Sequence, residues 1–183
     1  LKRISSRNTS IGFLELLPRI IINDIVGYLC YKNILLSISK NRGLNNYNAN
    51  IYIVLIDFVA IYFIFDFCFY FFHRLIHHPI LYYHIHKIHH STFADVAIST
   101  HYMGLLDYFL EIILPYWIAI SLWNSCYLAS FLFVVIGQLN GIITHGGYKF
   151  IGLPKPDDHR DHHIYFNKNY GSGGPWDYLL GTN

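Results

Sequence analysis

The stretch IYIVLIDFVAIYFIFDFCFYFFHRLIHHPILYYHIHKIHH, residues 51–90, joins a long apolar run to a segment rich in histidine. Residues 51–72 are almost all apolar, and a helix of that length, at about 1.5 Å per residue, crosses a hydrocarbon core of roughly 30 Å. In residues 73–90, seven of the eighteen positions are histidine. The stretch therefore predicts a membrane-spanning helix that delivers a cluster of histidines to one membrane surface.

The rest of the 183-residue chain also favours a membrane protein. Its composition is 54% hydrophobic and only 13% charged. Residues 105–122 and 125–143 are two further apolar stretches, and three such stretches leave too little polar sequence to cover them as buried core helices. We expect an all-α integral membrane protein. Asp57 and Asp66, inside the first stretch, should face other helices or a polar cavity because charge is costly in lipid.

The chain is expected to divide into an N-terminal part, residues 1–50, and a histidine-bearing domain, residues 51–183. Residues 11–37 are apolar but interrupted, which fits either a short span or a helix lying in the membrane interface. The interrupting residues are Pro18, Arg19, Asn23 and Asp24. Residues 38–50 are polar and rich in Asn, and they predict a connecting loop.

Charge and cysteine content exclude several other classes of protein. The net charge is +2 and no run of basic residues stands out, so nucleic acid is not an expected partner. The three cysteines are scattered through apolar sequence without CxxC pairing, which argues against a thiolate metal site or a disulfide framework. Neither feature indicates an oligomeric state.

The histidines recur with regular spacing. On a helix, the residues at positions i and i+4 lie on the same face. The residue at i+3 points about 100° away from the residue at i+4. One group has the four-residue spacing, and two groups read HxxHH. The groups are His73 and His77, then His86, His89 and His90, and finally His159, His162 and His163. This repetition indicates metal ligands.

Two single histidines bracket the second and third apolar stretches. His101 precedes residues 105–122, and His145 follows residues 125–143. If the two stretches form a helical hairpin in the bilayer, both histidines emerge on the same side, where the first span also delivers His73. One membrane face would then gather ten histidines.

The charge distribution predicts the orientation of that face. Residues 101–148 contain no Lys or Arg, whereas basic residues lie in the histidine-bearing segments. These are Arg74, Lys87, Lys149, Lys155, Arg160 and Lys168. By the positive-inside rule the histidine-rich face is cytosolic.

Ten imidazoles exceed the needs of one metal ion. A structural zinc site takes four ligands and a catalytic one three, so ten ligands indicate two metals with about five ligands each. Imidazole suits iron, zinc, copper and nickel, and the residues alone do not identify the element. His84 lies out of register and is expected to be an ordinary histidine rather than a ligand.

Two other kinds of membrane protein also collect histidines. A metal transporter should carry its ligands near the middle of its spans, and a haem-binding membrane cytochrome needs paired histidines deep in the bilayer. Here the histidines lie at the ends of the predicted spans and in polar connections, which disfavours both. A histidine-rich membrane protein that only binds or transports metal, without catalysing a reaction, remains an alternative to an enzyme.

The ordered motifs resemble the fatty acid hydroxylase superfamily of membrane di-iron enzymes, which includes sterol desaturases, sterol methyl oxidases and lipid hydroxylases. The resemblance runs from about residue 60 to the end and is strongest to the sterol methyl oxidase and sterol desaturase branch. It rests on HRLIHHPILYYHIHKIHH, the single His101, THGGY around His145 followed by LPKP, HRDHH at 159–163, NYG at 169–171 and WDYLLGT at 176–182. The segment STFADVAISTHYMG around His101 departs from the pattern of the family.

The resemblance implies a cytosolic helical cap that holds a di-iron site, and an oxidoreductase that hydroxylates, or further oxidises or desaturates, a lipid. The substrate would be a sterol or a fatty-acyl lipid in the endoplasmic reticulum membrane. The co-reactants would be dioxygen and electrons from a cytochrome b5-type or other donor. The implied iron ligands are His73, His77, His86, His89, His90, His101, His145, His159, His162 and His163.

Four further residues near these histidines are expected to lie around the ligands. Polar neighbours commonly fix the orientation of metal-binding imidazoles. The four are His78, Asp161, Asn169 and Asp177. A solvated loop is the alternative interpretation for the acids, and a turn near the site is the alternative for Asn169.

Overall fold

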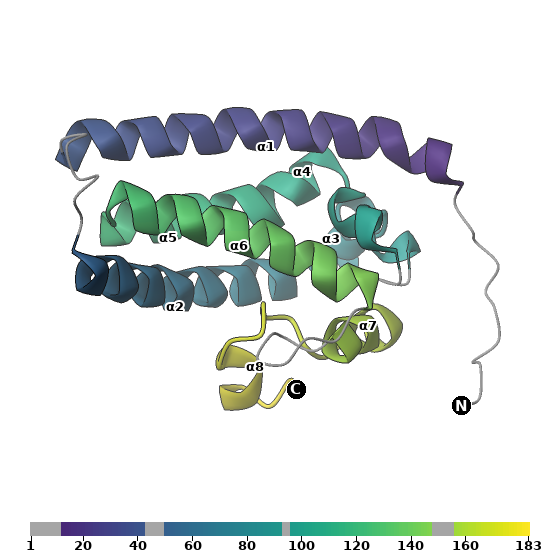
Figure 1. Ribbon diagram of the computed structural model, residues 1–183. Coiled ribbons are helices and arrows are strands. Elements are labelled where there is room, and N and C mark those ends of the chain that lie inside the picture. Colours follow the sequence, from purple (N-terminus) through teal and green to yellow (C-terminus); the bar gives the residue numbers. More distant parts are fainter. Residues whose placement is uncertain (1–11, 43–49, 93–95, 148–155) are drawn as a thin grey trace.

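The computed structural model describes residues 12–42, 50–92, 96–147 and 156–183, and the regular elements in these ranges are all helical (Figure 1). They are α1 (Phe13–Arg42), α2 (Ile51–Ile76), α3 (Pro79–His84), η2 (His89–Ser91), η3 (Ala97–His101), α4 (Leu105–Tyr108), η4 (Phe109–Ile113), α5 (Leu114–Trp123), α6 (Tyr127–Gly146), α7 (Pro156–Tyr165) and α8 (Trp176–Leu179).

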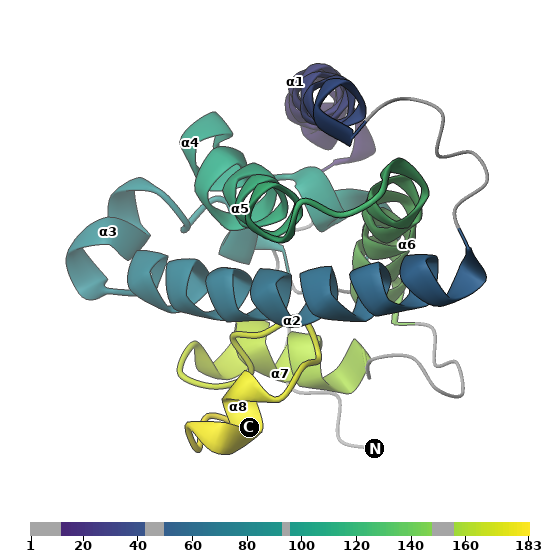
Figure 2. The same ribbon diagram turned by 90° about the vertical axis from the view of Figure 1, so that its left-hand side faces the viewer.

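The predicted all-α membrane fold is confirmed. Three helical stretches are long and apolar enough to cross a membrane, namely Ile51–Ile76, Leu105–Trp123 and Tyr127–Gly146. α1, α5 and α6 run alongside one another, α2 crosses α5 and α6 on the side away from α1, and α7 and α8 lie against the side of α2 that faces away from α1 (Figures 1 and 2). Histidines at the end of α2 and in α7 meet between the bundle and this second layer, which consists of α7 and α8.

Aromatic side chains form the centre of the bundle. The ring of Phe65 in α2 lies 4.4 Å from that of Tyr116 in α5 and 5.3 Å from that of Phe133 in α6. Tyr116 approaches α6 so closely that a side chain at Gly137 would overlap its hydroxyl group. The small residue therefore lets α5 and α6 pack tightly, as is common between membrane helices.

The predicted hairpin of the second and third apolar stretches is present. Residues 124–126 connect α5 to α6, and Asn124 ends α5 in the left-handed conformation, which Asn tolerates better than most residues. Asp57 of α2 secures this turn, because its carboxylate accepts hydrogen bonds from Trp123 Nε1 at 2.9 Å and from the backbone N–H of Cys126 at 2.6 Å. As expected, the buried acid faces neighbouring helices.

α1 is a single helix that is longer than the apolar pattern indicated. Residues 38–42 were expected to belong to a loop, but they continue the helix to Arg42, since residues 38–42 contain no glycine or proline and Gly43 follows them. The rest of the expected loop, residues 43–49, lies outside the described residues, as do Lys149 and Lys155.

A buried amide joins α1 to the short helix η3. Asn23, which is 1% exposed, donates hydrogen bonds from Nδ2 to the carbonyl oxygens of His101 at 2.8 Å and Met103 at 3.0 Å. Because an unpaired buried amide is costly, these bonds determine how α1 packs against the bundle. They also hold the backbone of His101 next to α1.

Candidate metal centre

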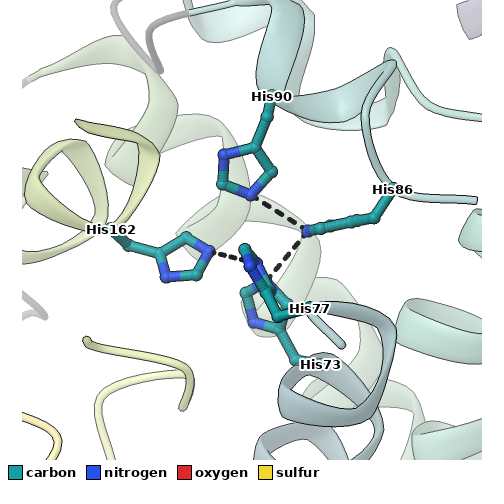
Figure 3. A group of neighbouring side chains, drawn as sticks. All are labelled: His73, His77, His86, His90 and His162. Carbon is teal, nitrogen blue, oxygen red and sulfur yellow. Dashed lines mark hydrogen bonds between the residues drawn. The ribbon is translucent and has the colours of Figure 1, made fainter. Parts of the chain in front are cut away.

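Nine of the twelve histidines meet in two neighbouring groups. The five-histidine group consists of His73, His77, His86, His90 and His162 (Figure 3). The four-histidine group consists of His89, His145, His159 and His163. Within each group the potential ligand atoms all lie within 4.8 Å of one another.

The five-histidine group draws its residues from three segments that are far apart in the sequence. Its Nε2 atoms point toward one another (Figure 3), with separations of 3.2 Å for His73 and His86, 3.1 Å for His86 and His90, and 3.0 Å for His77 and His162. His73 lies in the last turn of α2, and His77 caps that helix. His162 reaches the group from α7.

The four-histidine group lies directly beside the first. Nε2 of His159 is 2.8 Å from Nε2 of His145 and 3.2 Å from Nε2 of His163. The ring of His89 completes the group, with its centroid 5.1 Å from that of His145. The two groups touch where the rings of His90 and His163 stack at 4.3 Å.

Each HxxHH motif divides its histidines between the two groups. In the first copy, the outer pair His86 and His90 enters the five-histidine group, while His89 enters the other. In the second copy, the outer pair His159 and His163 enters the four-histidine group, while His162 enters the first. The second copy lies in α7, where a residue adjacent to the i+4 position points about 100° away from it. The first copy lies in the turn that leads into η2, and its histidines diverge in the same way, so each motif can serve two sites.

Hydrogen bonds on the outer side of the rings determine which nitrogen faces the centre. Nδ1 of His73 donates to the carbonyl of Tyr170 at 2.7 Å, Nδ1 of His162 to that of Lys168 at 2.6 Å, and Nδ1 of His163 to that of Thr92 at 2.9 Å. A carbonyl oxygen can only accept, so each Nδ1 carries the proton. The lone pair on Nε2 is then directed into the group, as metal binding requires.

The environment keeps these imidazoles neutral. Burial and the neighbouring histidines lower the pKa of His77 to about 3, and burial lowers the pKa of His163 to about 4 although its bond to Thr92 opposes the shift. Burial and nearby histidines also lower the pKa values of five further imidazoles well below the usual range. The five are His86, His89, His90, His159 and His162. Neutral imidazole is the form that binds metal.

The spacing of the nitrogens fits metal ions. Adjacent ligands of a six-coordinate ion with metal–nitrogen bonds of about 2.1 Å are about 3.0 Å apart, and the Nε2 pairs lie 2.8–3.2 Å apart. Neutral rings that face one another through unprotonated nitrogens gain nothing without a cation between them. The residues therefore fit two transition-metal ions, one in each group.

The structure does not bring His101, the tenth expected ligand, into either group. Its Nδ1 lies 2.5 Å from Oδ1 of Asp24 in α1, and its ring packs against Tyr108 with a centroid distance of 5.0 Å. The hydrogen bonds of Asn23 hold the adjacent backbone in the same place. Asp24, one of the few charged residues in the largely apolar segment 11–37, was the available sequence signal for this partner.

Of the four residues expected around the ligands, Asp177 holds the backbone segment whose carbonyl orients a ligand. Its carboxylate accepts the backbone N–H groups of Tyr170 at 2.8 Å and Gly171 at 2.6 Å, and the Tyr170 carbonyl accepts from His73. The other three make different contacts. His78 is exposed at the start of α3, Asp161 lies 3.6 Å from the Lys168 ammonium group, and Asn169 donates to the Asp158 carbonyl and adopts a positive φ.

Two buried acids beside the five-histidine group were not predicted. The carboxylate oxygens of Asp107 lie 2.9 Å and 3.0 Å from Nδ1 of His86. Glu111 places Oε1 3.7 Å from Nε2 of His73 and Oε2 3.4 Å from Nδ1 of His86. The signal was present in the sequence, because two acids four residues apart in an apolar span are costly unless they face a polar site.

The fold and the site define an all-helical protein with membrane-length helices and a histidine-rich centre suited to two metal ions. The family model described as "Fatty acid hydroxylase" matches residues 58–182, which is more than half of the chain. The chain belongs to the fatty acid hydroxylase family.

Several curated proteins are similar to this segment. Fatty acid hydroxylase domain-containing protein 2 of Homo sapiens is 33% identical over 63% of this chain and 34% of its own length. The Delta(7)-sterol 5(6)-desaturase of Leptosphaeria maculans is 35% identical over 64% of this chain and 34% of its own length. A fatty acid hydroxylase of Mycosarcoma maydis is 30% identical over 64% of this chain and 31% of its own length.

The chain spans about a third of the length of these relatives. No solved structure matches it significantly.

Proposed function

We propose that this chain is the catalytic part of a membrane-bound di-iron oxidoreductase that hydroxylates a lipid, or oxidises it further to a desaturated product. The observation that carries the proposal is the pair of histidine groups with their Nε2 atoms facing inward. The family match supports it, as do the similar sterol desaturase and fatty acid hydroxylase. Residues 51–183 would form the catalytic domain, and residues 1–50 a membrane-associated segment.

Two iron ions would supply the reduction of dioxygen and an oxidant strong enough to cleave an unactivated C–H bond, which no side chain can do. One dioxygen, two electrons and two protons convert the C–H bond into C–OH and one water. The nine histidines of the two groups would hold the ions. The carbonyls of Tyr170, Lys168 and Thr92 would maintain the inward direction of three of these ligands.

The position of the site suits a substrate that is dissolved in the membrane. His73 lies in the last turn of α2 and His145 in the last turn of α6, so both groups adjoin the ends of candidate spans. A sterol or fatty-acyl lipid could reach the site laterally from the bilayer without crossing water. The exposed Lys87 and Arg74 lie near the same end and could receive an acidic donor of the cytochrome b5 type.

The charge distribution supports a cytosolic orientation of the site, in the endoplasmic reticulum membrane. Residues 101–148, which hold the second and third candidate spans, carry no Lys or Arg, whereas Arg74, Lys87, Arg160 and Lys168 lie in the histidine-bearing segments. An external donor would then meet the site from the cytosol.

Lipid analysis of cells that express the protein tests this proposal. An oxygenated or desaturated lipid should accumulate with the wild type and with His84→Ala, because His84 is exposed and lies outside both groups. It should be absent with His86→Ala, which removes a central ligand. The active protein should contain about two iron ions per chain.

A product that forms without dioxygen would contradict the proposed reaction. An active preparation with one zinc ion and no iron would contradict the di-iron centre. A protein that binds metal but yields no lipid product under any condition would support the alternative of a membrane protein that binds or transports metal.

A further inference from the structure

Asp107 and Glu111 place two carboxylates behind the five-histidine group. Both residues are almost fully buried, with 0% and 2% of their surface exposed. Asp107 is fully engaged, because both of its oxygens lie within 3.0 Å of Nδ1 of His86. The carboxylate of Glu111 is not fully hydrogen-bonded, because its Oε2 atom is buried and makes no hydrogen bond.

The backbone around Glu111 is unusual as well. Glu111 is the central residue of η4, a five-residue π-helix that interrupts the second candidate span between α4 and α5. Such π-turns are rare, cost regular hydrogen bonding, and occur frequently at functional sites. The carboxylate of Glu111 lies on the same side as that of Asp107, toward His73 and His86.

Among the described residues, no Lys or Arg side chain pairs with either of these acids. Residues 101–148 contain no Lys or Arg, and among the described residues the ion-pair contacts to the two acids come from His73 and His86. Those histidines point their Nε2 atoms at other imidazoles in the group. A buried carboxylate without a charged partner is strongly unfavourable, so a cation in the five-histidine group would supply what the protein lacks.

We propose that Glu111 is the anionic partner of the five-histidine group. Its carboxylate balances the charge of a divalent ion held by five neutral imidazoles, while Asp107 orients His86 toward the same ion. Among the described residues, no Asp or Glu carboxylate joins the four-histidine group. The inference rests on the proposed function only in requiring that the five-histidine group binds a divalent metal.

Metal titration of the purified full-length protein in detergent tests this. Metal-free protein is equilibrated with Co²⁺, and the bound metal is counted over a range of free concentrations. The wild type should bind two ions. Glu111→Gln, which keeps the size of the side chain but removes its charge, should weaken one of the two sites at least tenfold and leave the other unchanged.

Two backgrounds identify the affected site. The weakening should persist when His89→Ala has disabled the four-histidine group, and it should disappear when His162→Ala has disabled the five-histidine group. Glu15→Gln is the matched control, because Glu15 is the only other glutamate in the sequence and is exposed on α1. It should bind metal as the wild type does.

Circular dichroism and thermal unfolding of the metal-free variants check that the fold is kept. If Glu111→Gln does not fold, Glu111→Asp retains the charge and should stay within threefold of wild-type affinity, whereas Glu111→Ala should not. Wild-type affinity of Glu111→Gln at both sites would overturn the proposal, and so would equal weakening of both sites. Metal binding is measured without turnover, so an absence of lipid product would count against the proposed function and not against this inference.

Discussion

The Nε2 atoms of His77 and His162 lie 3.0 Å apart, although 85 residues separate them in the chain. His77 caps the C-terminal end of α2, and His162 belongs to α7, which follows the third candidate span. The contact therefore forms only when the membrane-length helices and the second layer have assembled. The five-histidine group thus depends on the tertiary fold as a whole.

Removing a ligand from one histidine group should abolish metal binding at that group and leave the other group able to bind its ion. We expect His162→Ala and His89→Ala each to lower the metal content from about two ions per chain to about one, and to reduce turnover by orders of magnitude, since no neighbour can replace the lost nitrogen. Elemental analysis of purified protein measures the content. His84→Ala should retain both ions, and a comparable loss in that variant would contradict the assignment of the groups.

His101 should behave differently from His145. His101 pairs with Asp24 outside both groups, whereas His145 lies 2.8 Å from His159 within the four-histidine group. We expect His101→Ala to retain both metals and to affect stability by no more than about 1–2 kcal/mol, with Asp24→Asn giving a similar change. Loss of one metal from His101→Ala, measured beside His145→Ala, would restore His101 as a ligand.

Acid should destabilise the metal-free protein. The pKa of His77 is lowered to about 3 and that of His163 to about 4 in the folded state, whereas an unfolded chain protonates histidine near about pH 6.5. The unfolded state thus binds more protons between these values, and the free energy of unfolding falls as the pH decreases from about 6.5 to about 4. Each histidine contributes at most about 1.4 kcal/mol per pH unit.

Denaturant unfolding of the metal-free protein in detergent, at about pH 7.5 and about pH 5, measures this effect. The His77→Ala and His163→Ala variants should each show a smaller decrease than the wild type. An unfolding free energy that is the same at both pH values would show that these histidines are not buried in neutral form.

Asp177 should support the segment that orients His73. Its carboxylate accepts the backbone N–H groups of Tyr170 and Gly171, and also the Thr182 hydroxyl at 2.8 Å. Since each buried donor left unpaired costs about 1–3 kcal/mol, Asp177→Ala should lower the free energy of unfolding by about 2–4 kcal/mol and weaken metal binding. Thermal and denaturant unfolding provide the measurement.

Asp161→Ala is the control for this change, because its pair with Lys168 at 3.6 Å is partly exposed and should contribute less than about 1 kcal/mol. If both variants lost the same stability, the network around Tyr170 would not be the reason.

Local patterns in the sequence were sufficient to predict the helical membrane fold and the histidine motifs. An apolar run of spanning length has few alternatives in a chain with so little charge, and the spacing of the HxxHH motifs is visible without any structure. The hairpin of α5 and α6 could be predicted for the same reason, since both spans are bounded by polar residues. The length of α1 could not, because polar residues without glycine or proline continue a helix as readily as they form a loop.

What the sequence determined by itself is that histidines would gather at the ends of membrane-length helices. Only the tertiary structure decided how they are shared between two groups, because the direction of each imidazole depends on where its helix packs and on which carbonyl holds its Nδ1 atom. The same packing paired His101 with Asp24 and turned Glu111 toward His73. The contacts of His73 with Tyr170 and Glu111 and of His101 with Asp24 join residues 38 to 97 positions apart, and no local spacing encodes a distance of that kind.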